Sequence, residues 1–209
     1  PQLIAGPIVR YSDIEKEIEQ RTVTFDKISS GITRFVIGLF KKAVFANFLG
    51  ETATMFLNGE VSELSAVQGW IGIVAYFFQI YFDFSGYSDM AIGLGRMMGF
   101  SFPENFNYPF ISKSITEFWR RWHMTLGTWF RDYVYFPLGG SRTTGIKWLR
   151  NILVVWMITG FWHGAEWNFV LWGTFHGIAL AVHKMWMSII GRKKGEQSHG
   201  WRRVFGVII

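Results

Sequence analysis

Long apolar stretches broken by short polar interruptions dominate the chain. Residues 64–82 carry no formal charge over nineteen positions, and at about 1.5 Å per residue they can cross a hydrocarbon core of roughly 30 Å. This stretch predicts a membrane-spanning helix. The polar residues 83–89, which include Asp83 and Asp89, are predicted to form a connection rather than a substrate site. Residues 90–102 then resume an apolar pattern whose glycines favour close helix packing.

The last long apolar region, residues 152–182, contains Glu166 as its only formal charge. Its thirty-one residues exceed one ordinary spanning helix and fall short of two full ones, which favours a hairpin of short helices. With a helix starting just before this region, His163 would lie about 18 Å along the axis, near the middle of the hydrocarbon core. Gly160 and Gly164 flank this histidine and would allow a bend or a close approach of substrate.

Two earlier segments are less apolar. Residues 1–26 are mixed and predict a solvated helix. Residues 32–49 are apolar but include Arg34, Lys41 and Lys42. They either lie along the membrane interface or span the membrane with their cations near an aqueous face, and the pattern leaves both open.

The middle of the chain predicts a loop followed by a helix. Residues 103–109 are rich in turn formers. Ser114 and Glu117 have the spacing of a capping box, in which each side chain satisfies a backbone donor at a helix start. Continued without a break, this helix would present one basic and aromatic face with a titratable group. That face consists of Thr116, Trp119, Arg120 and His123.

Composition indicates a membrane protein, and together with the apolar stretches the expected fold is all-α and polytopic. Half of the residues are hydrophobic, and charged residues make up 17%, below the roughly 25% typical of soluble domains. The absence of cysteine excludes disulfides, thiolate metal sites and cysteine nucleophiles. The chain begins with Pro1 and ends on an apolar stretch, residues 205–209. We therefore expect an internal fragment of a longer protein.

Positive charge concentrates in residues 113–150, which contain seven lysines and arginines and two acidic residues. This segment therefore carries most of the net charge of +6 of the whole chain. The positive-inside rule predicts that this segment and the basic cluster 192–194 lie on the cytoplasmic side. The cations then contact anionic lipid or recognise an anionic donor or carrier protein, with equal weight. Nucleic acid is a poor third choice, because the sequence lacks a recognition-module pattern.

Four motifs resemble those of the membrane-bound O-acyltransferase family, and within it the membrane component of alginate and related polysaccharide O-acetylation systems. The motifs are residues 114–123 (SITEFWRRWH), 129–133 (WFRDY), 137–140 (PLGG) and 162–169 (WHGAEWNF). The opening residues 1–8 also resemble an internal segment of those proteins. Phe161 stands where these proteins commonly have leucine. This departure leaves the match of the adjacent Trp162 and His163 to the family motif intact.

The resemblance implies one partial transmembrane domain of this family over residues 1–209, lacking its amino-terminal helices and its carboxy-terminal end. It also implies a tunnel for acyl transfer in a multi-pass protein of the bacterial cytoplasmic membrane. The catalytic histidine would be His163, as general base, and the second characteristic histidine would be His123. Further substrate-binding or tunnel residues would be Arg120, Arg121, Trp162, Glu166 and Asn168.

No bound cofactor is implied, because the acetyl donor is a substrate, with acetyl-coenzyme A as one candidate whose phosphates Arg120 and Arg121 would meet. The implied partners are membrane lipid, the acyl donor, an extracytoplasmic acetyltransferase and a polysaccharide acceptor. Two alternatives stay open: D-alanyl transfer from a carrier protein to a cell-wall polymer, and a non-catalytic membrane conduit or scaffold.

Other chemistry is disfavoured. A metal site at His176 and His183 lacks a third ligand at recognisable spacing, and no nucleophile elbow accompanies the histidines. A structural role for His123, hydrogen bonded beside Trp119 and Trp122, weighs as much as a catalytic one. For Asn168, a hydrogen bond at a helix start explains the residue as well as a place in the tunnel does.

Overall fold

The computed structural model describes residues 6–59, 64–143 and 145–190. Residues 1–5, the basic cluster 192–194 and the apolar end 205–209, which the sequence analysis used, lie outside these ranges. All regular elements in the described ranges are helical, which confirms the all-α prediction. The chain divides into two compact units, Pro1–Asn105 and Phe106–Ile209.

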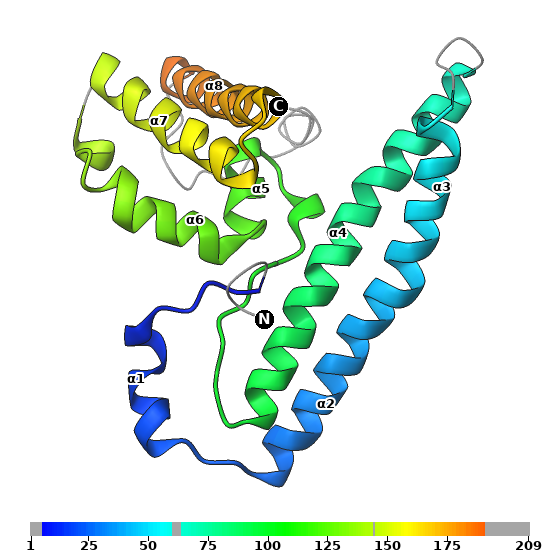
Figure 1. Cartoon of the computed structure of the whole chain (residues 1–209). Coiled ribbons are helices and arrows are strands. Elements are labelled where there is room, and N and C mark those ends of the chain that lie inside the picture. The colour runs from blue at the N-terminus through cyan, green and yellow to red at the C-terminus, as the bar shows by residue number, and fades with distance from the viewer. Residues whose placement is uncertain (1–5, 60–63, 144, 191–209) are drawn as a thin grey trace. The chain divides into compact units, whose positions relative to one another are not determined.

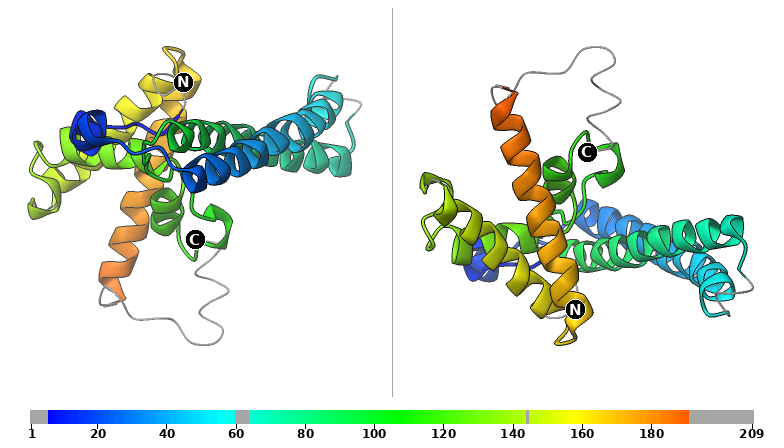
Figure 2. Two further views of the ribbon diagram at one scale, coloured as in Figure 1. Left: turned by 90° about the horizontal axis from the view of Figure 1, so that it is seen from below. Right: turned by 90° about the horizontal axis from the view of Figure 1, so that it is seen from above.

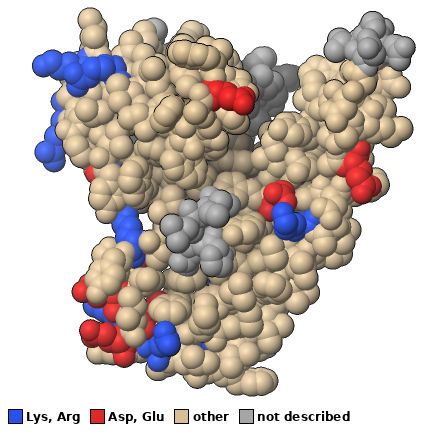
Figure 3. Space-filling view, viewed as in Figure 1, with Lys and Arg blue, Asp and Glu red and all other residues tan. Residues whose placement is uncertain are grey.

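The first unit is built on a long helical hairpin. One arm runs without a break through α2 (Phe25–Phe40), a π-helical turn η1 (Lys41–Ala46) and α3 (Asn47–Leu57), and the other arm is α4 (Ala66–Met97). The two arms lie side by side in all views (Figures 1 and 2). Helix α1 (Tyr11–Gln20) has no buried residue, which confirms the predicted solvated helix. Charged side chains gather over α1, whereas the visible face of the hairpin carries few (Figure 3).

Residues 83–89 do not form a connection, so that prediction is wrong: they lie inside α4. Asp83 and Asp89 are accommodated within the helix because lysine and arginine side chains of the opposite arm neutralise their carboxylates. The side chain of Asp89 is 8% exposed, and its carboxylate accepts hydrogen bonds from Arg34 Nε at 2.8 Å and from Lys41 Nζ at 2.6 Å. Lys42 pairs with Asp83. The segment 90–102 is correspondingly the last part of α4, which ends at Met97, followed by a loop.

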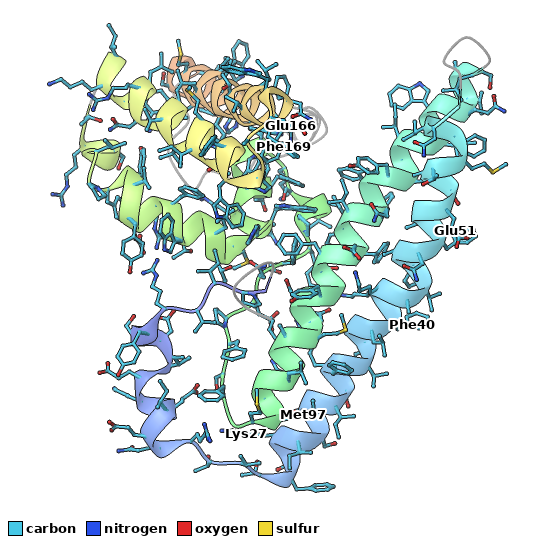
Figure 4. All side chains as sticks on the ribbon, viewed as in Figure 1. Lys27, Phe40, Glu51, Met97, Glu166 and Phe169 are labelled. Atoms are coloured by element: carbon cyan, nitrogen blue, oxygen red, sulfur yellow. The ribbon has the colours of Figure 1, made fainter. Side chains whose placement is uncertain are left out.

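Glycines bring the two arms into backbone contact. A Cβ added at Gly38 would lie 2.5 Å from the carbonyl oxygen of Gly86, and one at Gly31 would lie 2.7 Å from that of Gly93. The reverse contacts are equally tight. In Figure 4 the labels Lys27 on α2 and Met97 on α4 mark the end of the hairpin near the contact between Gly31 and Gly93. The prediction of close helix packing at glycine is confirmed at Gly93.

The second unit contains short helices followed by a helical hairpin. Its short elements are η3 (Pro109–Ile111), α5 (Ile115–Arg121), α6 (Met124–Phe130), the π-helical turn η4 (Arg131–Tyr135) and η5 (Gly140–Arg142). The hairpin consists of α7 (Ile146–His163) and α8 (Trp167–Ile189), joined by three residues. The hairpin predicted for residues 152–182 is confirmed, but its helices have 18 and 23 residues and extend beyond that range at both ends, so the prediction of short helices is wrong. Among the helices of the described ranges, none combines the length and the apolar character that crossing a bilayer requires.

We expect Gly38→Ala to destabilise the protein, because the added methyl group would meet the backbone of α4. Overpacking of this kind costs about 1–3 kcal/mol, more than the roughly 1 kcal/mol that alanine gains over glycine in a helix. The measurement is the thermal unfolding midpoint of the purified protein in detergent. Gly50→Ala is the matched control, because its Cβ would have an ordinary contact of 3.5 Å. Equal midpoints for the two variants would contradict the packing argument.

Candidate active site

His163 is the last residue of α7. The prediction that this helix starts just before residue 152 is wrong, and the depth of His163 in the membrane stays a prediction. The helix begins at Ile146, several residues earlier than expected, because Trp148 and Asn151 are buried and hold its first turns against the unit. It ends at Gly164, whose extended backbone leads into the turn before α8. His163 therefore lies about 26 Å along the helix from its start, beside the turn where Figure 4 labels Glu166 and Phe169.

The hydrogen bonding of His163 determines which of its ring nitrogens is available. Nδ1 lies 2.7 Å from the carbonyl oxygen of Thr159, one turn earlier in α7. A carbonyl oxygen can only accept, so Nδ1 carries the proton in this contact. In the neutral ring the lone pair is then on Nε2, which is the arrangement that a general base requires.

His163 is an exposed residue that contacts two tryptophan rings. Its ring centroid lies 5.1 Å from that of Trp162 and 5.0 Å from that of Trp172 on α8. Trp162 also contacts His123, at a centroid distance of 6.2 Å. The structure thus brings together the two histidines and the tryptophan that the sequence assigned to the site.

His123 does not continue the face of α5, contrary to the prediction. Helix α5 ends at Arg121, and Trp122 adopts an extended backbone with its ring stacked on Phe118 at 5.6 Å. His123 itself has φ 46° and ψ 52°, in the left-handed region, and precedes α6. For a residue other than glycine this conformation is strained and is found disproportionately at functional sites. The anchored Trp122 side chain ends α5 and redirects the chain at His123.

Burial keeps His123 uncharged. Its side chain is 6% exposed, and burial, with a smaller contribution from the charge of His163, lowers the pKa of His123 to about 3. A neutral imidazole cannot attract donor phosphates. His123 is therefore suited to hydrogen bonding or positioning and not to electrostatic binding of an anion.

The two adjacent arginines have different environments. Arg121 donates to Glu117 Oε1 at 3.1 Å and to the carbonyl oxygen of Asn107 at 3.2 Å, so its guanidinium holds the unit together. Arg120 is exposed and forms no hydrogen bond or ion pair within the described residues. Of the two, Arg120 is the one available to an external anion.

The cap of α5 forms with one change from the predicted capping box. Ser114 Oγ accepts the backbone N–H of Glu117 at 3.2 Å, as expected. The carboxylate of Glu117 accepts the N–H of Lys113 at 2.9 Å, one residue before the cap residue. This bond is the main reason that the pKa of Glu117 is lowered. Helix α5 is therefore fixed at its start.

The remaining predicted site residues lie at the turn between α7 and α8. Glu166 is exposed and forms no side-chain cap. Asn168 Oδ1 accepts the N–H of Phe169 at 2.9 Å, the helix-start hydrogen bond that was the alternative to a tunnel role. Both lie close in sequence to His163, but no contact in the described chain joins them to it.

Two histidines of α8 belong to the same unit in a way that the sequence did not indicate. His183 Nδ1 lies 2.9 Å from Thr116 Oγ1, which ties α8 to α5. His176 lies among three tryptophans, Trp119, Trp156 and Trp172. Within the described residues no group of three or more histidine, cysteine or acidic side chains could hold a metal ion. Only the spacing of four between Trp172 and His176 on one helix face could have suggested this cluster.

Residues 1–207 match the model of the MBOAT, membrane-bound O-acyltransferase, family. The chain belongs to this family. It is 50% identical over 184 residues to the probable alginate O-acetylase AlgI of Azotobacter vinelandii, covering 88% of the chain and 36% of that protein. It is 45% identical over 187 residues to a peptidoglycan O-acetyltransferase of Helicobacter pylori, covering 88% of the chain and 35% of the relative.

A more distant match is the teichoic acid D-alanyltransferase of Bacillus subtilis, at 31% identity over 221 residues, covering all of the chain and 55% of that protein. The chain thus spans little more than a third of the length of the acetylating relatives. The family assignment confirms the resemblance drawn from the motifs.

We expect the protein to lose folding stability as the pH falls, because of the buried His123. Its pKa lies below that of an unfolded histidine, near 6.5, so the unfolded chain binds a proton first as the pH falls. Stability is then lost between about pH 6.5 and pH 3, with a loss of about 2 kcal/mol between pH 7 and pH 5. The measurement is the unfolding midpoint of wild type and His123→Asn at both pH values. Asparagine tolerates the left-handed backbone, and an equal acid loss in this variant would contradict the assignment to His123.

Proposed function

We propose that the protein containing this chain transfers an acetyl group from a cytoplasmic activated donor, across or into the membrane, for O-acetylation of an exported polysaccharide such as alginate. The family membership supports acyl transfer. The names of the relatives at 45–50% identity, which act on alginate or peptidoglycan, support acetyl as the group and a polymer as the acceptor.

The observation that carries the proposal is the hydrogen bond from His163 Nδ1 to Thr159. It leaves the Nε2 lone pair to take the proton of an acceptor hydroxyl, whose oxygen then attacks the acetyl carbonyl. The C–S bond of a thioester donor breaks, and the leaving thiolate takes up that proton from His163. Histidine suits this role because its ordinary pKa lies near neutral pH. The rings of Trp162 and Trp172 limit how the imidazole can turn, so Nε2 keeps one direction.

A multi-pass arrangement in the bacterial cytoplasmic membrane is part of this proposal. It is supported by the large apolar side chains that α4 and α8 leave exposed, since soluble surfaces rarely expose contiguous apolar patches of this kind. On α4 they include Val67, Trp70, Ile73, Val74, Tyr76 and Phe77. On α8 they include Leu171, Phe175, Ile178, Val182, Met185 and Trp186. Lipid and the other helices of the intact protein would cover them, and a tunnel would form with those helices.

The donor would approach from the cytoplasmic side, where the excess of cations in residues 113–150 is expected. A thioester such as acetyl-coenzyme A is the proposed donor, and its phosphates would meet Arg120. The acetyl group would reach the polysaccharide through an extracytoplasmic acetyltransferase partner.

The test is the acetate content of exported polysaccharide in cells carrying the full-length protein as wild type or His163→Ala. We expect loss of acetate by about 10²-fold or more, the usual contribution of a general base. Met157→Leu, an exposed position of the same helix, is the control for membrane abundance. Full acetate in His163→Ala at normal abundance would remove the base role and favour the conduit.

The acceptor assay also separates the second enzyme function. The teichoic acid relative matches the whole chain, which keeps D-alanyl transfer as a candidate. Ester-linked D-alanine that depends on His163, with no dependent acetate, would establish that alternative.

The two arginines give a matched pair of variants. Arg120→Gln should raise the KM for acetyl-coenzyme A about tenfold while leaving protein abundance unchanged, because an exposed guanidinium that contacts phosphate contributes mainly to binding. Arg121→Gln should lower thermal stability, because its bonds to Glu117 and Asn107 are lost. Kinetics and unfolding midpoints of both variants check the assignment. It fails if Arg120→Gln leaves the KM unchanged.

A further inference from the structure

Four aromatic side chains of the second unit form a cluster that we name the tryptophan box: Trp119 of α5, Trp156 of α7, and Trp172 and His176 of α8. The ring centroid of Trp119 lies 4.5 Å from that of Trp156 and 4.9 Å from that of His176. Trp172 lies 4.9 Å from His176. Three helices thus converge on one group of rings.

Two polar atoms inside the tryptophan box are buried and have no hydrogen-bond partner in the described part of the chain. They are Trp119 Nε1 and His176 Nδ1, on rings that touch edge to face. Buried polar groups are nearly always hydrogen bonded, and an unsatisfied pair costs free energy. Because an indole N–H can only donate, its missing partner is an acceptor atom.

The position of Trp119 is fixed by bonds on the same helix. Ser114 caps α5 through the N–H of Glu117, and Thr116 is hydrogen bonded to His183 at 2.9 Å. Trp119 follows Thr116 by one turn of α5, and His176 precedes His183 by two turns of α8. The hydrogen bond between Thr116 and His183 therefore holds Trp119 and His176 opposite each other.

The tryptophan box adjoins the candidate base. Trp172 contacts His163 at 5.0 Å and His176 at 4.9 Å between ring centroids. The two imidazole centres are therefore no more than about 10 Å apart, a span that an acceptor hydroxyl about 3 Å from Nε2 of His163 and about 3 Å from the acetyl carbon can bridge. A group bound at the two polar atoms would belong to the same reaction site as His163.

We propose that Trp119 Nε1 and His176 Nδ1 bind the carbonyl oxygen of the acetyl group that is transferred, an inference that rests on the proposed acyl transfer. A carbonyl oxygen has two lone pairs and accepts both N–H groups when Nδ1 carries the ring proton. No ion pair or cation–π contact reaches the tryptophan box within the described residues. An uncharged ligand fits these surroundings, whereas a bare anion does not. The aromatic walls suit the methyl group of acetyl.

The test compares the binding of two probes to the full-length enzyme in membranes. They are S-acetylpantetheine and S-ethylpantetheine, and the second lacks only the carbonyl oxygen of the thioester. We expect wild type to bind the acetyl probe about 25-fold more tightly than the ethyl probe, for two hydrogen bonds of about fivefold each. Trp119→Phe and His176→Phe keep a ring and remove one N–H. Each should reduce the preference about fivefold, the loss of one ordinary hydrogen bond. A purely structural role would weaken both probes equally.

Trp148→Phe is the matched control, because it removes another buried indole N–H, on α7 but outside the tryptophan box. It should leave the preference unchanged. Equal binding of the two probes by wild type would overturn the proposal, as would a full preference in both Trp119→Phe and His176→Phe. Failure of the proposed function would show separately, as acetate retained in His163→Ala.

Discussion

Contact between helix backbones at glycine is the constraint on which both units depend. In the first unit Gly31 and Gly38 meet Gly93 and Gly86 on the opposite arm. In the second, a Cβ at Gly173 would fall on the carbonyl oxygen of Trp156 across the α7–α8 hairpin. Such contacts leave no room to slide one helix along another, because every shift would place a side chain where only hydrogen fits.

A fixed register determines which polar groups meet. In the first unit it brings both Arg34 and Lys41 to Asp89, so a carboxylate is buried with two cations. A buried charge that lost these partners would cost several kcal/mol, about 3–5. The π-helical turn η1 begins at Lys41, and the two successive lysines there reach carboxylates six residues apart on α4. Backbone contact and charge pairing therefore specify the same arrangement.

The sequence predicted what periodicity and chemistry fix locally. Helical class, the α7–α8 hairpin and the cap at Ser114 all followed from residue patterns, whereas the catalytic role of His163 stays a prediction. The charged stretch with Asp83 and Asp89 was misread as a connection, because the cations that neutralise it lie some forty to fifty residues away. The break before His123 was missed for a similar reason, since it depends on how the Trp122 ring packs.

The two histidines of the candidate site, His123 and His163, differ in burial and hydrogen bonding, and neither sequence motif shows this difference by itself. His123 is buried and stays neutral, in a strained backbone conformation. His163 ends a helix with Nδ1 hydrogen bonded to the carbonyl oxygen of Thr159 and Nε2 available. Trp162 contacts both rings. Under the proposed base role of His163, a neutral His123 would shape the site without adding a charge that disfavours protonation of His163.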